Sequence, residues 1–396
     1  MNIVDAGPAA ATMSKRARGL STSSLIELFL LARERDAIDL AVGSPGYPCT
    51  PPPLLDAAVE ALRAGHNQYE IPAGDAALRR HIAATFAAPT DPDTQITVTV
   101  GGTEALCVAL LTSIDPGDEV IVLEPFYENF LSAIALAGGV TRVVALRPPD
   151  WTWDPADLAA AFGPRTKAIM VNTPANPTGR VLDRAELDEI ATLCSRWGVT
   201  VISDEVYSGL LFDDRTHVSV ADVEALDPYS IVIGSLSKGA AVSGWRLGYL
   251  RADPARTAVL RRVHETTTNG TGAPLQRAAG AVGLPGAPWW RPAPGLAERR
   301  NVAQRILHDM GLTFRPADGG CFLLADISGV TSEDSTTYVR CLLAERNVLL
   351  VPGGGFFADR ARGRAYVRMA FNRPMETLDA AARALVGPPP VPRSTP

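Results

Sequence analysis

Between residues 95 and 251, short runs of aliphatic and β-branched residues alternate with longer stretches of helical periodicity. The short runs are apolar at nearly every position, which is typical of strands covered on both faces of a mostly parallel sheet. The predicted strands are 96–100, 119–123, 141–145, 168–172, 200–203, 231–234 and 246–250. The helical stretches between them are 104–114, 130–137, 157–162 and 184–197. The pattern predicts a large α/β domain around a mostly parallel seven-stranded sheet.

A different pattern follows residue 285, where a stretch rich in proline, glycine and tryptophan (285–295) interrupts the alternation. Beyond it, helices at 296–310 and 337–346 alternate with strands at 320–325, 348–351 and 366–371, and a helix closes the chain. This order predicts a smaller α+β domain. A helix at 24–35 and a strand at 38–42 are predicted near the start. The predicted division is 1–45 as N-terminal arm and part of the small domain, 46–284 as large domain, 285–386 as small domain, and 387–396 as a disordered tail.

Composition narrows the class of protein. Of the residues, 46% are hydrophobic and 20% charged, as in an ordinary globular protein, and the net charge of −6 argues against nucleic acid as a partner. No apolar run approaches membrane length, and no leader pattern is present, so a cytoplasmic protein without a membrane partner is expected. The five cysteines and five histidines have no metal-ligand spacing, so no metal site is predicted.

Lys238 is the first candidate for chemistry. Only three of the 37 basic residues are lysines, and this one lies in the segment Ser235-Leu236-Ser237-Lys238, eight residues before Arg246. An amine can lose its proton and condense with an aldehyde, which a guanidinium cannot do. The two hydroxyls and Arg246 suit a phosphate dianion. An aldehyde that carries a phosphate and fits this set is pyridoxal 5'-phosphate (PLP); a surface lysine in a loop is the simpler alternative.

Residues after three other predicted strands agree with a PLP site, because ligands of open α/β sheets bind outside the carboxyl ends of strands. Gly102 and Thr103 begin a helix directly after a strand, where free amides favour a phosphate; a plain turn is the alternative. Tyr127 follows the next strand and is suited to stack on a pyridine ring, although an ordinary packed tyrosine is equally compatible. Asn176, in a turn shaped by two prolines, is predicted to donate to the phenolate 3'-oxygen of PLP.

Asp204 and Tyr207 follow a further predicted strand. A carboxylate at the end of a buried strand is unfavourable unless it has a cationic partner. A protonated pyridine nitrogen would be such a partner, and the pair would keep the ring electron-withdrawing. Tyr207 is placed to donate to the 3'-oxygen. A helix N-cap is the alternative for Asp204.

In combination and in this order, these motifs resemble the class I/II aminotransferase family of fold type I PLP-dependent enzymes, over about residues 20–386. The segments that carry the resemblance are Gly101-Gly102-Thr103, Asn176-Pro177-Thr178-Gly179, Ser203-Asp204-Glu205-Val206-Tyr207, Ser235-Leu236-Ser237-Lys238 and Gly244-Trp245-Arg246-Leu247-Gly248-Tyr249.

The resemblance implies specific roles. Lys238 would form the internal aldimine and move a proton between Cα and C4', and Asp204 would hold the ring nitrogen. Asn176 and Tyr207 would hold the 3'-oxygen, and Tyr127 would stack on the ring. The implied phosphate ligands are Gly102, Thr103, Ser235, Ser237 and Arg246.

Three further roles follow from the resemblance. Tyr69, in Asn67-Gln68-Tyr69, would reach the phosphate of the neighbouring subunit, which implies a homodimer with shared active sites. Arg368, in Tyr366-Val367-Arg368-Met369, would clamp the substrate α-carboxylate. Gly43 would add a backbone donor, and Asn176 would also face the substrate.

The reaction expected is transfer of an amino group from an L-amino acid to a 2-oxo acid. Gly46 stands where the family usually has an aspartate, and no second arginine is marked as a clamp for a side-chain carboxylate, so a neutral, aromatic or unusual amino acid is the hypothesis for the substrate. The alternative is a specialised PLP enzyme of secondary metabolism that performs β- or γ-elimination, replacement or cyclisation, because the fold hosts each of these reactions. A PLP-binding transcriptional regulator is not expected, since only about twenty residues precede the first predicted helix.

Overall fold

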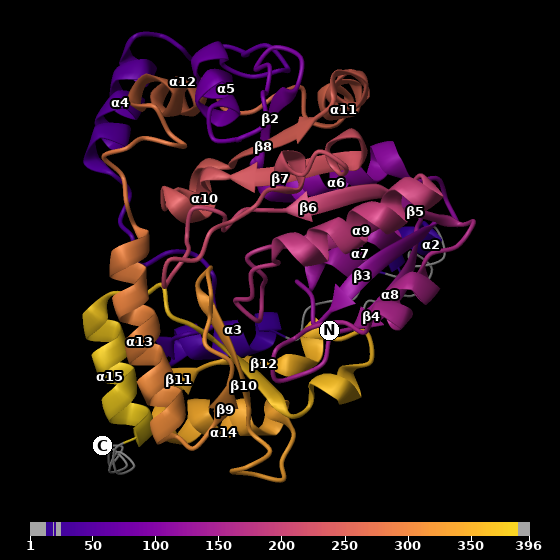
Figure 1. The fold of residues 1–396 in the computed structure, drawn as a ribbon. Helices are drawn as coiled ribbons and strands as arrows, with labels where there is room; N and C mark the ends of the chain where they lie inside the picture. Colours follow the sequence, from indigo (N-terminus) through magenta and orange to yellow (C-terminus); the bar gives the residue numbers. More distant parts are fainter. Residues whose placement is uncertain (1–12, 19, 21–24, 387–396) are drawn as a thin grey trace.

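The computed structural model describes residues 13–18, 20 and 25–386, and its largest element is a seven-stranded sheet (Figure 1). The strand order is β2-β8-β7-β6-β5-β3-β4. Only β8 runs antiparallel to its neighbours, so the prediction of a mostly parallel seven-stranded sheet is confirmed. The strands are β2 (Ile96–Val100), β3 (Glu119–Glu124), β4 (Val140–Ala145), β5 (Thr166–Asn172), β6 (Thr200–Asp204), β7 (Ser230–Ser235) and β8 (Leu247–Ala252).

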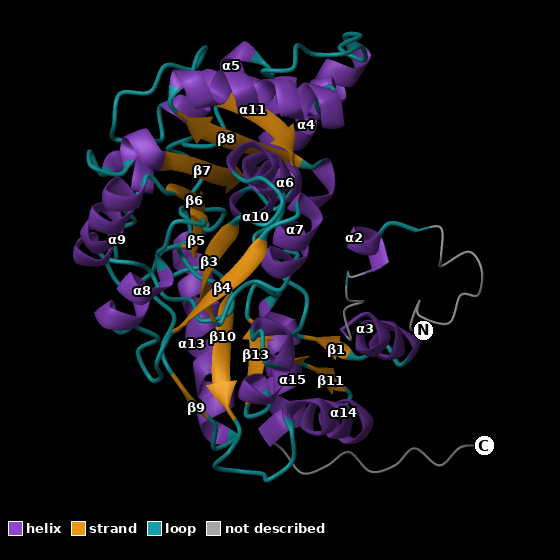
Figure 2. Cartoon of the chain, turned by 90° about the vertical axis from the view of Figure 1, so that its right-hand side faces the viewer, coloured by secondary structure: helices purple, strands orange, loops and turns teal. Residues whose placement is uncertain are grey.

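Helices cover both faces of this sheet, and Figure 2 shows α8 and α9 on one side of the strands and α6 and α7 on the other. Successive side chains of a strand point to opposite faces. Val120 and Val122 accordingly join a core with α6, α7 and α11, whereas Ile121 between them packs with α8 and α9. The helices are α6 (Gly101–Ser113), α7 (Asn129–Ala137), α8 (Pro155–Ala161), α9 (Arg184–Trp197) and α11 (Pro254–Thr267).

The edge of the sheet at β2 and β8 packs against helices that the sequence pattern did not predict. They are α4 (Pro52–Arg63), α5 (Ala76–Ala83) and α12 (Ala273–Val282). Both α4 and α12 have proline in the first turn, where its missing N–H does no harm. Leu54, Leu78 and Ala279 are buried in the resulting core with Ile96 and Leu247.

The strand predicted at 246–250 needs a correction, because β8 begins only at Leu247. Arg246 has φ 55° and ψ 50°, which is left-handed backbone and cannot belong to a strand. This conformation costs a non-glycine residue roughly 1–2 kcal/mol. Short one-turn elements join the strands here, namely α10 (Leu236–Gly239), η2 (Val220–Asp222), η3 (Asp227–Tyr229) and η4 (Ser243–Trp245).

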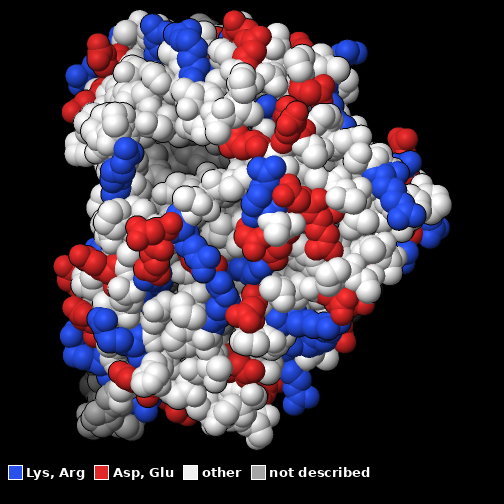
Figure 3. All heavy atoms as spheres, viewed as in Figure 1, with Lys and Arg blue, Asp and Glu red and all other residues white. Residues whose placement is uncertain are grey.

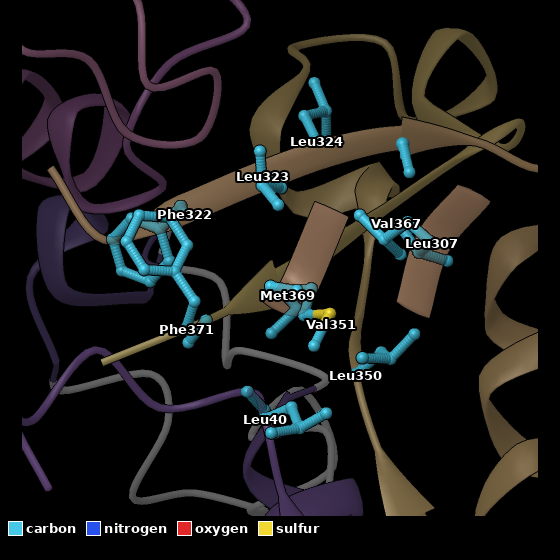
Figure 4. Packing of buried hydrophobic residues seen from close by; sticks show 14 of the residues in the cluster. Leu40, Leu307, Phe322, Leu323, Leu324, Leu350, Val351, Val367, Met369 and Phe371 are labelled. Atoms are coloured by element: carbon cyan, nitrogen blue, oxygen red, sulfur yellow. The ribbon is translucent and has the colours of Figure 1, made fainter. Parts of the chain in front are cut away.

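A second, smaller sheet with the order β12-β13-β10-β9 is surrounded by the C-terminal helices and by α3 (Leu25–Glu34). Its core brings Leu40 from the N-terminal part beside Met369 and Phe371 (Figure 4). The strand predicted at 348–351 is divided: β11 pairs with β1 (Ile38–Asp39), and β12 joins β13. The elements are α13 (Ala293–Asp309), β9 (Thr313–Phe314), β10 (Phe322–Asp326), α14 (Ser335–Arg346), β11 (Val348–Leu349), β12 (Val351–Pro352), η5 (Gly353–Phe356), η6 (Arg360–Gly363), β13 (Tyr366–Ala370) and α15 (Met375–Val386).

Two predictions concern residues that are largely outside the description. The beginning of the predicted N-terminal arm falls mainly on residues that the structure does not describe, apart from a short helix, α2 (Lys15–Arg18). The predicted disordered tail, 387–396, lies wholly outside the described residues.

Candidate active site

A cavity of about 490 Å³ lies at the carboxyl ends of β5, β6 and β7. Its wall contains every residue predicted for the site except Tyr69. Residues that the sequence argument did not assign also face it, among them Asn172, Phe322, Ser44, Glu128 and Asn129. The predicted residues in the wall are Gly43, Gly102, Thr103, Tyr127, Asn176, Asp204, Tyr207, Ser235, Ser237, Lys238, Arg246 and Arg368.

Lys238 and Asp204 face the cavity from the ends of neighbouring strands. Lys238 lies in α10, directly after β7, and its Nζ donates to the carbonyl oxygen of Gly43 at 3.0 Å. Burial lowers the pKa of Lys238, which favours the neutral amine. Asp204 ends β6, and burial raises the pKa of Asp204 to about 7, although the N–H of Val206 and the charge of Lys238 oppose the rise. The cavity therefore holds an amine that is more easily deprotonated and a carboxyl group that is costly to ionise without a cation beside it.

The turn from β2 into α6 forms one wall of the cavity. Gly101 has φ +70°, and a Cβ there would lie 2.8 Å from Cζ of Arg246, so the guanidinium rests directly on this turn. The N-cap residue of α6, Val100, makes no side-chain cap hydrogen bond, and Gly102 and Thr103 in the first turn face the cavity. Exposed amides and the helix dipole favour negative charge at such an end. Arg246 is held over the turn by its Nη1, which donates to the carbonyl of Ser243 at 2.8 Å.

Ser235 and Ser237 complete this wall. The Ser235 hydroxyl accepts from the amide of Ser237 at 3.0 Å and donates to the carbonyl of Leu247 at 3.1 Å. These contacts fix the short α10 helix that carries Lys238 against the start of β8.

Asn176 and Arg368 meet in the wall of the same cavity. Arg368 Nη1 donates to Asn176 Oδ1 at 2.9 Å, and Nη2 donates to the carbonyl of Ala41 at 2.8 Å. The guanidinium carbon lies 4.2 Å from the ring centre of Phe322 and 4.9 Å from that of Phe356. Within the described part of the chain, its Nε has no hydrogen-bond partner although it is buried. A planar carboxylate is the kind of ligand that satisfies a guanidinium in such a setting.

Asn172 and Arg373 are supporting residues that the sequence argument missed. Asn172 accepts from the amide of Asn176 at 2.7 Å and donates to the carbonyl of Asp204 at 2.8 Å, so it ties two predicted site residues together. Arg373 donates to the carbonyls of Asp39, Val42 and Ser44 and thereby fixes the segment that carries Gly43. Asn172 could have been suspected from its place beside the Asn176 turn, but Arg373 gave no signal.

Four predicted residues remain, namely Tyr127, Tyr207, Gly43 and Tyr69. Tyr127 accepts from Asn129 Nδ2 at 2.7 Å, and the Tyr207 ring centre lies 6.0 Å from Nζ of Lys238. Burial raises the pKa of both phenols, so both stay protonated. The carbonyl oxygen of Gly43 accepts from Lys238, and the backbone donation to substrate predicted for Gly43 stays a prediction. Tyr69 lies outside the cavity with 89% of its surface exposed.

The residues present fit PLP. PLP needs an amine for its aldehyde, an acid for its ring nitrogen and hydrogen-bond donors for its phosphate. The cavity supplies the amine of Lys238, the acid of Asp204, and donors in the wall that contains Gly102 and Arg246. A model of the family described as aminotransferase class I and II matches residues 35–385. The chain belongs to this family.

Relatives with established names agree with this membership. A probable N-succinyldiaminopimelate aminotransferase, DapC, from Mycobacterium tuberculosis is 34% identical and aligns over 93% of this chain and 97% of its own. The methionine aminotransferase of Escherichia coli is 32% identical, with 92% and 96% covered. The solved structure of the mycobacterial N-succinyldiaminopimelate aminotransferase superposes with a TM-score of 0.90 at 33% identity, covering 94% of this chain and 99% of that one.

As a member of this family, the protein has the fold type I architecture and is a PLP-dependent aminotransferase, which moves an amino group between an amino acid and a 2-oxo acid. When bound, PLP supplies an aldehyde that condenses with amines and a ring that withdraws electrons from the α-carbon. On the face drawn in Figure 3, acidic and basic side chains are interspersed, and no extended basic patch is visible. Among the helices in the described part of the chain, none is long and apolar enough to cross a bilayer.

Proposed function

We propose that Lys238 carries the cofactor and moves a proton to and from the substrate α-carbon, while Asp204 holds the protonated ring nitrogen. The observation that carries this proposal is that the two side chains face one cavity from neighbouring strand ends, with the pKa of the amine lowered and that of the acid raised. The lowered pKa makes the neutral amine, the form that acts as a base, easier to reach. Tyr127 stacks on the ring, and Asn176 and Tyr207 donate to the 3'-oxygen.

The remaining cofactor contacts are assigned to the wall between β2 and β8. Amides at the start of α6 and the guanidinium of Arg246 bind the phosphate, a combination of helix dipole and fixed charge that favours a dianion. This assignment is supported by the contact between Arg246 and the Gly101 turn. The proposed phosphate ligands are Gly102, Thr103, Ser235, Ser237 and Arg246.

For the substrate, Arg368 binds the α-carboxylate, assisted by Asn176 and the Gly43 segment. The basic residues that line the cavity from the described part of this chain are Lys238, Arg246 and Arg368, and each has a role in this scheme. None is left over to bind a side-chain carboxylate. The proposed amino donor is a neutral, aromatic or unusual amino acid rather than a dicarboxylic one, and this proposal includes that the partner subunit adds no basic residue to bind a side-chain carboxylate.

The active unit is proposed to be a homodimer in which Tyr69 reaches the partner's phosphate site. Support comes from the outer face of α4, where Leu55, Val59 and Leu62 follow helical spacing and are 45%, 45% and 48% exposed, and from Tyr69 itself. Such an apolar face beside an exposed tyrosine is typical of an interface. Leu62→Glu should be a monomer by light scattering and should bind PLP more weakly. Val330→Glu, at an apolar position with a similar exposure of 43%, should remain a dimer with unchanged PLP binding.

We also propose a domain division and a cellular location. The domain division proposed is 1–45 as N-terminal arm and part of the small domain, 46–284 as the large domain and 285–386 as the rest of the small domain, supported by the shared core of Leu40 with the C-terminal strands. A cytoplasmic location is supported by the absence of disulfides among the five cysteines, all of which the structure describes as free.

A half-reaction without acceptor tests the proposal. The PLP-loaded protein is mixed with alanine, methionine, phenylalanine, kynurenine and aspartate, and the keto acid formed is identified. A neutral or aromatic amino acid should yield its keto acid in stoichiometric amount. Aspartate far outperforming the others would contradict the substrate assignment, and loss of a side-chain group with return of the starting spectrum would contradict transamination.

A further inference from the structure

A second cavity, of about 570 Å³, lies behind the segment that carries Asp204. Val206 and Ser235 face both cavities, so a single layer of backbone separates them. Glu205 and His217 face only the second cavity. Because neighbouring residues at a strand end point to opposite sides, Asp204 and Glu205 place two carboxylates back to back.

The carboxylate of Glu205 is fully engaged. It is only 4% exposed, and its Oε1 accepts from the Ser203 hydroxyl at 2.8 Å and from the amide of Val220 at 3.1 Å. Its Oε2 lies 2.9 Å from Nε2 of His217, whose side chain is 10% exposed. Burial lowers the pKa of His217, but the charge and hydrogen bond of Glu205 outweigh burial, so the net shift of this pKa is upward. The 2.9 Å contact identifies a buried hydrogen-bonded pair, and the upward shift of the His217 pKa favours its charged form, although Nδ1 of His217 has no hydrogen-bond partner among the described residues.

This pair matters because Glu205 acts electrostatically on the cofactor side. Its negative charge raises the pKa of Asp204. A negative Glu205 without a partner would raise the pKa of Asp204 and of any group that Asp204 binds. A positive charge on His217 opposes this rise. The other ionisable groups that face the second cavity are Arg215, Asp222, Tyr249 and Arg291. Arg215 is paired with Asp318 at 3.2 Å.

We propose that Glu205 and His217 form a charged positioning pair that sets the electrostatic balance behind Asp204 and thereby the protonation of the cofactor held there. This inference rests on the proposed role of Asp204. Neither residue touches the cofactor cavity, so both act through Asp204 and the backbone that bears it. The chemical role is that of a charge-compensating pair, distinct from a neutral hydrogen-bonded support.

The test is the pH at which the absorbance of bound PLP changes, measured for the holoenzyme and three variants. Removing the positive charge in His217→Gln should move this midpoint up by about one pH unit, the effect of one charge at about 10 Å with an effective dielectric constant near 20. Glu205→Gln removes the charge that keeps His217 protonated, so this variant and Glu205→Gln/His217→Gln should both leave the midpoint close to the original value. A matched control is His308→Gln, whose side chain is 83% exposed, and it should leave the midpoint unchanged.

An upward shift in His217→Gln that disappears in the double variant supports the pair; no shift in His217→Gln, or a shift of the same size in the double variant, overturns it. Asp204→Asn distinguishes failure of the proposed role of Asp204 from failure of the proposed Glu205–His217 pair. If Asp204→Asn leaves the spectrum and its midpoint unchanged, the proposed role of Asp204 fails. If Asp204→Asn changes them and the pair variants do not, only the further inference fails. Should a single variant not fold, nitrogen NMR of the histidines in the unaltered holoenzyme decides: a neutral His217 at pH 6.5 overturns the proposal, and a charged one supports it.

Discussion

Gly248→Ala tests whether the cofactor wall depends on close backbone contact. Gly248 lies in β8 between Thr99 of β2 and Ser235 of β7. A Cβ at this position would lie 2.7 Å from the amide nitrogen of Gly102 and 2.8 Å from the carbonyl oxygen of Gly101, and closer still to the Gly101 carbonyl carbon. All three atoms belong to the backbone, so no side-chain rotation relieves the overlap.

The overlap must therefore move the β2–α6 turn away from β8. Carbon atoms pack against neighbours at about 3.5–4.0 Å, so the displacement needed is on the order of 1 Å. Overpacking of this kind costs about 1–3 kcal/mol in stability. The same displacement separates the α6 amides from Arg246, so binding of the phosphate end of PLP should weaken by at least tenfold, or about 1.4 kcal/mol.

Fluorescence titration with PLP and thermal unfolding of the cofactor-free protein give the two quantities. Gly163→Ala is the matched control, because nothing lies within 4 Å of a Cβ there and its φ is not in the left-handed region. We expect Gly163→Ala to match the parent in both measurements. A Gly248→Ala protein with unchanged PLP affinity would refute the argument that this crossing shapes the phosphate site, whatever its stability.

Three further predictions concern single side chains. Lys238→Ala should abolish the attachment that borohydride fixes, while PLP still binds non-covalently; retained turnover would contradict the assigned role of the amine. Arg368→Gln should raise KM for the amino acid about 10–100-fold, the loss of a charged hydrogen-bonded contact worth about 1.5–3 kcal/mol, with PLP affinity unchanged in the titration. The pKa of Asp204 is raised to about 7 in the folded, cofactor-free protein, above the ordinary value of 3.8. Its folded form therefore holds the proton longer than the unfolded form, so its contribution to stability is greatest below pH 3.8 and is lost as the pH rises to about 7. Denaturant unfolding should show that Asp204→Asn gains stability relative to the parent between pH 5 and pH 8, and equal pH dependence of the two proteins would contradict this shift.

Most residues that the sequence predicted for the site line one cavity, because they follow strand ends. Apolar runs located the strands, and the polar residues directly after them had to meet at one edge of the sheet. Lys238, Asp204 and Asn176 were found in this way, and all three line one cavity.

The supporting residues could not be found by the same reasoning. Arg373 binds carbonyls of the segment at residues 39–44, which is more than 300 residues away along the chain. Phe322 is an apolar strand residue like its neighbours, and only the packing of β10 places it under Arg368. The helices α4 and α12 were missed because proline near their start indicates a loop when no partner for their apolar face is known.

One physical cause accounts for both unusual ionisable groups in the site. Burial disfavours the charged form of any side chain, so it lowers the pKa of Lys238 and raises the pKa of Asp204 at the same time. A neutral amine is the form that reacts with a carbonyl carbon, and a buried acid gains most from a cationic partner. Burial in one cavity thus shifts the pKa values of both groups, and substitutions that admit water should reduce both shifts together. Widening the wall with Phe322→Ala should consequently move the pKa of Lys238 up and that of Asp204 down, which titration of the cofactor-free protein by NMR can detect; shifts of the same sign would show that local charges rather than burial control the site.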